Sequence, residues 1–130
     1  MSVDAIGDFL TIIRNGLMAS KSDIVAPYSR ITFEIATILK DEGFIHDCLV
    51  FEEDGWKKIK IILKYVDGES VIHEIARASK PGRRLYTGAT GVKPVIGGLG
   101  ISILSTNRGI ITNKKAKELN VGGEVMCTVW

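Results

Sequence analysis

Residues 103–112 read ILSTNRGIIT, a short stretch that changes from apolar to polar residues and back again. Apolar pairs at 103–104 and 110–111 flank the polar run Ser105-Thr106-Asn107-Arg108, which Gly109 closes. An ordinary connection between a strand and a helix needs only one or two turn residues. Here three small side chains that both donate and accept hydrogen bonds stand beside a cation. The stretch therefore predicts a polar loop that serves more than chain reversal.

The composition of this loop is typical of a surface that binds RNA. The hydroxyls of Ser105 and Thr106 and the amide of Asn107 suit base edges and ribose 2′-hydroxyls in an irregular groove. Arg108 can contact a phosphate, and Gly109 lets the backbone approach closely. The alternative is structural, in which Ser105 and Asn107 only satisfy backbone groups of the turn.

Charge is distributed unevenly along the 130 residues, although the net charge is only +2. Residues 1–74 hold 8 Lys+Arg against 13 Asp+Glu, a balance of −5. Residues 75–130 hold 9 Lys+Arg against 2 Asp+Glu, a balance of +7, and residues 75–117 contain no acid. Such asymmetry indicates a polyanionic partner for the second half. A solvated basic face is the alternative.

Several classes of protein are excluded by what the sequence lacks. Its longest apolar runs are too short to span a bilayer, and the N-terminus carries acids where a signal peptide has basic residues. Cys48 and Cys127 lie in apolar runs, as expected for reduced structural thiols of a cytoplasmic protein. Metal-ligand spacings such as CxxC or HExxH do not occur. We therefore predict no metal, no cofactor and no membrane partner.

Hydrophobic periodicity places the first half in the α+β class. Apolar residues at helical spacing predict a helix over residues 4–19, with Ser2 or Asp4 as N-cap. A short strand at 23–27 precedes a second helix, which Ser29 caps and Gly43 ends. Two strands, FIHDCLVF and KIKIILKY, follow and are joined by the acidic turn EEDGW. The expected order is αβαββ.

The second half differs in composition, because nine of the 14 glycines lie from Gly82 to Gly123. VIHEIARAS, RRLYT and ISILS predict strands, KPG predicts a turn, and Thr112 is the expected N-cap of a short helix, NKKAKEL. EVMCTVW predicts a final strand. The sequence thus predicts two small lobes, an αβαββ lobe over residues 1–66 and a mostly β lobe with one short helix over residues 67–130.

A second candidate site surrounds the KPG turn, where cations precede an aromatic residue. On an extended strand Arg84 and Tyr86 would face the same side. That arrangement suits stacking on an unpaired base while phosphates are held alongside. A core position for the Tyr86 ring is the alternative. The cations of this cluster are Arg77, Lys80, Arg83 and Arg84.

Enzymatic chemistry has weak support in the sequence. The run IGGLGISI lacks a complete phosphate-binding fingerprint and leads into a strand pattern, which favours tight packing at a strand entry. His46 and His73 are expected to be ordinary strand histidines, because neither has a nucleophile pattern beside it. The carboxylates Glu52, Glu53 and Asp54 share one solvated turn. We predict that the protein is not an enzyme.

Four segments together resemble the family of small-subunit ribosomal protein eight in its bacterial form. GLGISILSTNRGIIT and NKKAKELNVGGEVMCTVW are similar to the C-terminal signature of that family, and the resemblance extends to DAIGDFLTIIRNGLMA and KPGRRLYTG. It covers essentially the whole chain. The sequence departs from the family in having Asn107 where many members have serine, and GATGV where a more charged linker is common.

The resemblance implies a cytoplasmic ribonucleoprotein of translation with two α/β lobes and no catalytic activity. It implies direct binding to the central domain of small-subunit ribosomal RNA early in ribosome assembly, beside neighbouring small-subunit proteins. Some bacterial members also bind their own messenger RNA. Carried over by motif, the RNA contacts would be Tyr86, Ser105, Thr106, Asn107, Gly122, Gly123 and Glu124.

Glu124 is an unusual member of that set, since an acid should repel RNA. We expect the strand that it opens to lie beside residues 103–108, so that its carboxylate accepts from Ser105 or Asn107, or from an amino group of a base. An exposed acid at the end of the strand, which would repel RNA, is the alternative. The cations Arg83, Arg84, Arg108, Lys114 and Lys115 are expected to position RNA through phosphates. The competing interpretations are a small-molecule enzyme that uses the Gly-rich loop and a DNA-binding or protein-scaffold module that uses the basic face.

Overall fold

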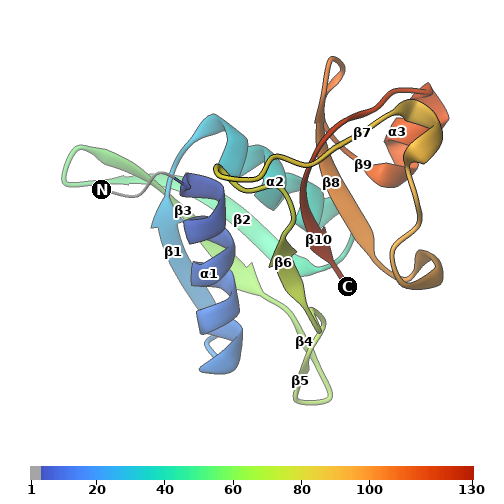
Figure 1. Cartoon of the computed structure of the whole chain (residues 1–130). Coiled ribbons are helices and arrows are strands. Elements are labelled where there is room, and N and C mark those ends of the chain that lie inside the picture. Colours follow the sequence, from blue (N-terminus) through green and yellow to red (C-terminus); the bar gives the residue numbers. More distant parts are fainter. Residues whose placement is uncertain (1–3) are drawn as a thin grey trace. The chain divides into compact units, whose positions relative to one another are not determined.

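The computed structural model describes residues 4–130 and is shown in Figure 1. Its contacts divide these residues into two compact units. One unit comprises Asp8–Ile72, and the other comprises residues 4–7 together with His73–Trp130. The predicted division at Asp67-Gly68 stays a prediction; this turn itself lies inside the first of the two units.

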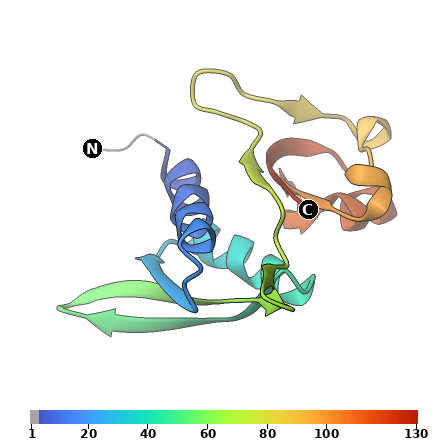
Figure 2. The same ribbon diagram turned by 90° about the horizontal axis from the view of Figure 1, so that it is seen from below.

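The unit of residues 8–72 has the predicted αβαββ order at its centre. Its three-stranded sheet is antiparallel throughout, with β3 between β1 and β2. Helices α1 and α2 lie on the same side of this sheet (Figure 2). Alternate strand residues therefore face the helices, which is why the buried and exposed positions of β3 alternate. The elements are α1 (Ala5–Met18), β1 (Asp23–Pro27), α2 (Arg30–Asp41), β2 (Ile45–Glu53) and β3 (Trp56–Leu63).

Both helices begin where the sequence predicts. Asp4 caps α1 by accepting from the Gly7 amide at 3.1 Å, whereas the other candidate, Ser2, lies outside the described residues. Ser29 caps α2 in a capping box, because its hydroxyl accepts from the Thr32 amide and the Thr32 hydroxyl accepts from the Ser29 amide. Gly43 follows the end of α2 at φ = 81°, a conformation that glycine adopts without strain.

Two hairpin turns in this unit contain an Asp-Gly pair. Asp54-Gly55 joins β2 to β3, as the EEDGW turn predicts, and both residues have positive φ. Asp67-Gly68 has the same conformation and joins β4 (Tyr65–Val66) to β5 (Glu69–Ser70). The sequence analysis missed this second hairpin because two-residue strands carry no periodicity.

The second unit is an antiparallel sheet built around the last strand of the chain. Strand β10 pairs with β8 along one edge and with both β6 and β7 along the other, and β9 extends the sheet beyond β8. Its side chains Ile103, Cys127 and Val129 are fully buried. The elements are β6 (Ile75–Arg77), β7 (Tyr86–Thr87), β8 (Ile101–Thr106), β9 (Gly109–Thr112), α3 (Asn113–Leu119) and β10 (Gly123–Val129), with 3₁₀ turns at Ala89–Gly91 and Ile96–Gly98.

Three predictions for this unit need correction. Residues 103–112 form the β8–β9 hairpin and not a strand followed by a loop, because Ile110-Ile111 completes the sheet edge. The strand expected over VIHEIARAS is limited to Ile75–Arg77, and RRLYT contributes only Tyr86–Thr87. The other predictions hold, since the mostly β unit with one short helix is present and the Thr112 hydroxyl caps α3.

Removal of the α2 capping box should cost measurable stability. We expect Ser29→Ala to lower the free energy of unfolding by about 1 kcal/mol, because the Thr32 amide loses the hydroxyl that accepts from it. Ser29→Asp should recover most of that loss, since a carboxylate can accept from the same amide. Urea unfolding followed by circular dichroism measures both. Equal losses for the two variants would show that the cap contributes little.

Candidate nucleic-acid interface

Three of the predicted contact residues form one row across three strands. Glu124 on β10 lies directly opposite Tyr86 on β7 and directly opposite Ser105 on β8. Opposed residues of antiparallel strands project from the same face of a sheet. The phenol, the carboxylate and the hydroxyl therefore line one face. The strand containing Glu124 does lie beside residues 103–106, as expected from the sequence.

Two glycines make this row possible. A Cβ on Gly123 would overlap the carbonyl oxygen of Ser105, and a Cβ on Gly122 would overlap the carbonyl of Thr87. The start of β10 thus enters between β7 and β8 in a space that admits only backbone. Gly122 and Gly123 are accordingly required by packing within the protein, in addition to any contact that they make with a ligand.

The Glu124 carboxylate does not accept from Ser105 or Asn107, which corrects the expectation from the sequence. Its Oε2 accepts from the Ser79 hydroxyl at 2.5 Å and from Nη1 of Arg84 at 3.1 Å. Ser79 is fully buried, and its hydroxyl also accepts from the Leu85 amide at 3.1 Å. Glu124 therefore fixes the segment 79–85, which leads directly into Tyr86. Glu124, Ser79 and Arg84 are called the carboxylate clamp below.

Ser79 was missed by sequence analysis because its partner lies 45 residues away. The carboxylate clamp also changes the pKa of Glu124. The Ser79 hydrogen bond, with the Arg84 hydrogen bond and charge, lowers the pKa of Glu124 against the opposing effect of burial. The carboxylate stays ionised, with 19% of its side chain exposed, and its charge is largely compensated within the protein.

Tyr86 is an exposed ring and not a core residue. Its exposed fraction is 68%, which excludes the alternative of a buried position. Tyr86 is the first residue of the two-residue strand β7, which pairs with β10. An aromatic face presented to solvent from a fixed backbone position suits stacking on an unpaired base.

The tip of the β8–β9 hairpin divides its polar groups between structure and surface. The Thr106 hydroxyl donates to the Gly109 carbonyl at 2.9 Å and accepts from the Arg108 amide at 3.0 Å, so it holds the turn. Within residues 4–130, the Ser105 hydroxyl and the Asn107 amide make no hydrogen bond to another protein group. The structural alternative proposed for Ser105 and Asn107 therefore applies to Thr106 instead.

The predicted cations are not gathered into a single patch. Arg84 belongs to the clamp, Arg108 is exposed at the hairpin tip, and Arg83 is exposed in the turn closed by a backbone bridge to Lys80. Lys114 and Lys115 are exposed in the first turn of α3, where Lys115 lies 3.9 Å from Glu118.

Arg77, which the sequence grouped with these cations, serves a structural role. Its side chain is 9% exposed, pairs with Asp4 at 3.3 Å and donates to the Met126 carbonyl at 2.7 Å. These contacts tie the start of α1 to strands β6 and β10 inside one unit. Arg77 is therefore excluded from the candidate interface.

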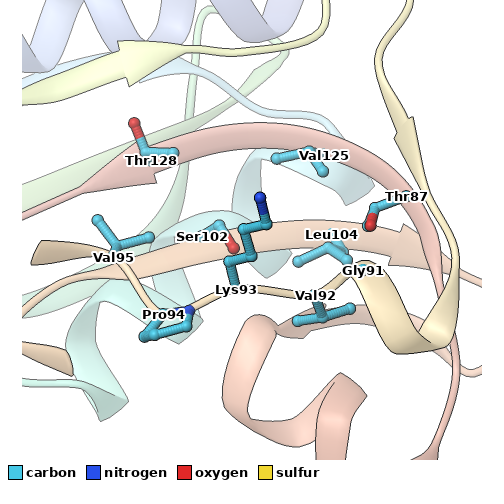
Figure 3. A pocket seen from close by; sticks show the side chains of 10 residues that line it. All are labelled: Thr87, Gly91, Val92, Lys93, Pro94, Val95, Ser102, Leu104, Val125 and Thr128. Carbon is cyan, nitrogen blue, oxygen red and sulfur yellow. The ribbon is translucent and has the colours of Figure 1, made fainter. Parts of the chain in front are cut away.

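A cavity of about 200 Å³ lies on the opposite face of the same sheet (Figure 3). Leu104 and Val125 point toward it, whereas their neighbours Ser105 and Glu124 project from the other face. Its lining contains no acid, histidine or cysteine, and the only side chain in it that ionises is that of Lys93. The lining residues are Thr87, Gly91, Val92, Lys93, Pro94, Val95, Ser102, Leu104, Val125 and Thr128.

The Gly-rich run near this cavity is structural. A Cβ on Gly100 would come within 2.6 Å of the Val129 carbonyl oxygen, which agrees with the prediction of tight packing at a strand entry. His46 is an exposed residue of β2, as predicted. His73 lies in a bend and not in a strand, with its ring 5.4 Å from that of Trp130. Among the described residues, no group of three metal ligands and no helix suited to crossing a membrane is found.

Comparisons with known proteins match the chain from end to end. A family model described as Ribosomal protein S8 matches residues 4–130. A small ribosomal subunit protein uS8 of Solibacter usitatus is 46% identical over 100% of both chains. Proteins of the same description from Maricaulis maris and Dechloromonas aromatica are 48% and 45% identical, over 99% and 97% of this chain and 99% and 96% of their own.

The carboxylate clamp should make stability depend on pH in a defined direction. Because the folded-state pKa of Glu124 is lowered, its stabilising contribution is complete above its unfolded pKa, roughly 4.3, and is lost as pH falls through the folded value. We expect Glu124→Gln to lower the free energy of unfolding by about 1–2 kcal/mol at pH 7, and by progressively less as the pH falls below the unfolded value. Denaturant unfolding over a series of pH values from 7 downward measures this trend.

Proposed function

The chain belongs to the ribosomal protein S8 family, and on that premise we propose that it is a structural component of the small ribosomal subunit. Family membership identifies a non-enzymatic protein of translation. The chemistry of the second unit supports direct binding to the RNA of the subunit. The observation that carries this proposal is the row of Tyr86, Glu124 and Ser105 beside the unpartnered amide of Asn107.

Each group in the row suits a different part of an irregular RNA helix. The exposed Tyr86 ring can stack on a base that has left the helix. Ser105 and Asn107 have donors and acceptors that remain available for base edges and 2′-hydroxyls. Gly122 and Gly123 let the start of β10 pack between β7 and β8, which holds these groups side by side. Surrounding cations supply attraction that does not depend on sequence, since residues 75–130 carry a balance of +7.

Glu124 acts in this proposal as a positioning residue. Its charge is directed at Ser79 and Arg84, which keeps an acid at the interface from opposing the approach of phosphates. The clamp fixes the segment before Tyr86 and so sets the distance between the phenol and the hairpin tip. This role replaces the direct contact with Ser105 or Asn107 that the sequence suggested.

The finer parts of the proposal concern which RNA is bound. We propose the central domain of small-subunit ribosomal RNA as the site, bound early in assembly and beside neighbouring small-subunit proteins. The same interface would accept a messenger RNA that reproduces this site, including the protein's own. These statements are supported by family membership together with the recognition chemistry of the row.

Sedimentation tests the proposed function directly. We expect the protein in a cell lysate to sediment with small subunits, and the purified protein to bind an isolated central-domain fragment more tightly than fragments of the other domains. A DNA of the same sequence should bind weakly, because it lacks 2′-hydroxyls. Recovery only in the soluble fraction would contradict the ribosomal role, and equal binding to DNA would contradict RNA recognition.

The hairpin tip should specify the site while α3 only adds attraction. We expect Asn107→Ala to weaken binding to the cognate fragment by about 1 kcal/mol and to leave binding to a plain duplex unchanged. Lys114→Ala should weaken both, and should reduce the steepness of the salt dependence by about 1. Competition titrations over a range of salt measure these effects. Proportional losses on both RNAs for both variants would contradict this division of roles.

A further inference from the structure

The cavity behind the candidate interface has the features of a ligand site that the proposed function does not use. It measures about 200 Å³ and lies between strands β8 and β10 and the segment of residues 88–95, on the sheet face that carries Leu104 and Val125 (Figure 3). A space of this size suits a molecule smaller than a drug, since sites for drug-sized ligands measure about 300–1,000 Å³. Residues 88–95 are called the strap below.

Most of the cavity lining is apolar. Leu104 and Val125 line it from the sheet, and Val92, Pro94 and Val95 line it from the strap. The polar side chains of the lining are three hydroxyls and one amine, from Thr87, Ser102, Thr128 and Lys93. An apolar ring can therefore pack between the sheet and the strap, whereas an ionised group of a ligand finds an opposite charge only at the amine.

The charge of Lys93 is not compensated within the protein. Among residues 4–130 its amine forms no ion pair and no hydrogen bond with another protein group. The surrounding sequence, residues 75–117, contains no acid. Figure 3 shows the Lys93 side chain running from the strap across β8 toward β10. An anionic group of a ligand would thus meet one available cation and no carboxylate of the lining.

One buried amide fastens the strap to the sheet. Asn113 is buried, its Oδ1 accepts from the Ser102 amide at 3.1 Å, and its Nδ2 donates to the Lys93 carbonyl at 3.2 Å. Strand β9 ends at Thr112, so the Ser102 amide has no strand partner on that side of β8. The Asn113 side chain takes the place of that partner and holds the backbone of Lys93 beside the cavity.

Backbone contacts fasten the other end of the strap. The Val95 carbonyl accepts from the amides of Gly98 and Gly100, both at 3.0 Å. Ile96, the next residue, has φ = 47°, which is a strained conformation for a β-branched side chain. Strain of this kind persists only where the surrounding structure imposes it, and it is concentrated at binding sites. The strap is therefore fixed on both sides of Lys93 in the absence of a ligand.

We propose that this cavity binds a small molecule that joins an apolar ring or branched chain to a single anionic group such as a carboxylate. Leu104 and Val125 pack on one side of the apolar body and the strap packs on the other, while the Lys93 amine pairs with the anion. A partner protein is a less suitable occupant, because a stable protein interface buries about 800 Å² on each side and this cavity is far smaller. The site and the row of Tyr86, Glu124 and Ser105 lie on opposite faces, so both can be occupied together.

Titration of the full chain with a matched pair of probes tests the site. Indole-3-acetate carries a carboxylate beside an indole ring, and indole-3-acetamide has nearly the same shape without the charge. Methyl shifts of Val92, Val95, Leu104 and Val125 in NMR spectra report on occupancy of the cavity. We expect indole-3-acetate, with about a dozen heavy atoms, to bind with a Kd of about 1 mM. The acetamide should bind about fivefold more weakly at low salt, because it forms no ion pair with Lys93.

Three variants separate the anion site from the apolar space. Lys93→Met removes the amine and keeps an apolar stem, so it should abolish the preference for the acetate and leave acetamide binding unchanged. Lys21→Met makes the same charge change at an exposed position of the 8–72 unit and should alter neither Kd. Val92→Trp fills the cavity from the strap and should prevent both probes from shifting the methyl groups of Leu104 and Val125. Thermal unfolding checks that each variant keeps its fold.

Several outcomes would overturn the proposal. Equal affinity for the two probes, or a preference for the acetate that survives Lys93→Met, would show that the cavity holds no anion site. Probe-dependent shifts that spare the four methyl groups, or that persist in Val92→Trp, would place the probe elsewhere on the protein. The absence of binding by either probe would show that the cavity is only an imperfection of packing. Because the titrations contain no RNA, these outcomes count against this site and leave the proposed function untouched.

Discussion

The second unit depends on a steric constraint at Gly122 and Gly123. Backbone carbonyls of Thr87 and Ser105 lie where side chains at these positions would be. Only because both Cβ atoms are missing can β10 enter between β7 and β8 and pair with each of them. A side chain at either glycine would force one neighbour away. The alignment of Tyr86, Glu124 and Ser105 would then be lost together with the backbone hydrogen bonds.

That alignment gives the two faces of one sheet different chemistry. Glu124 and Ser105 project to one side with Tyr86, and Val125 and Leu104 project to the other, where they line an apolar cavity. Hydrogen bonds fix two parts of the polar face. Ser79 and Arg84 hold the Glu124 carboxylate, and the Thr106 hydroxyl holds the tip of the β8–β9 hairpin. Groups left without protein partners, such as the Asn107 amide, are thereby presented from a fixed frame.

Local signals explain which parts of the structure could be predicted from sequence. The Ser29 cap and the strand alternation of residues 58–63 depend on neighbours in the chain, and both were found. The hairpin strand at Gly109–Thr112 was missed because four residues show no periodicity before their pairing partner is known. Ser79 was missed, and Arg77 was wrongly grouped with the exposed cations, for a related reason. Their partners, Glu124 and Asp4, lie 45 and 73 residues away, and charge alone does not reveal which cation is buried.

The ion pairs show which of the unevenly distributed cations are available to a polyanion. In the second unit Arg84 pairs with Glu124, Arg77 with Asp4 and Lys115 with Glu118. The cations that remain for a polyanion lie at the hairpin tip, in the 80–83 turn, at Lys93 and at the other lysines of α3. In the 8–72 unit Lys58 pairs with Glu53, Lys60 lies 4.0 Å from Asp23, and 11 acids outnumber 8 cations. Since attraction to RNA grows with each phosphate that a cation neutralises, this balance favours the second unit as the part of the chain that holds a phosphate backbone.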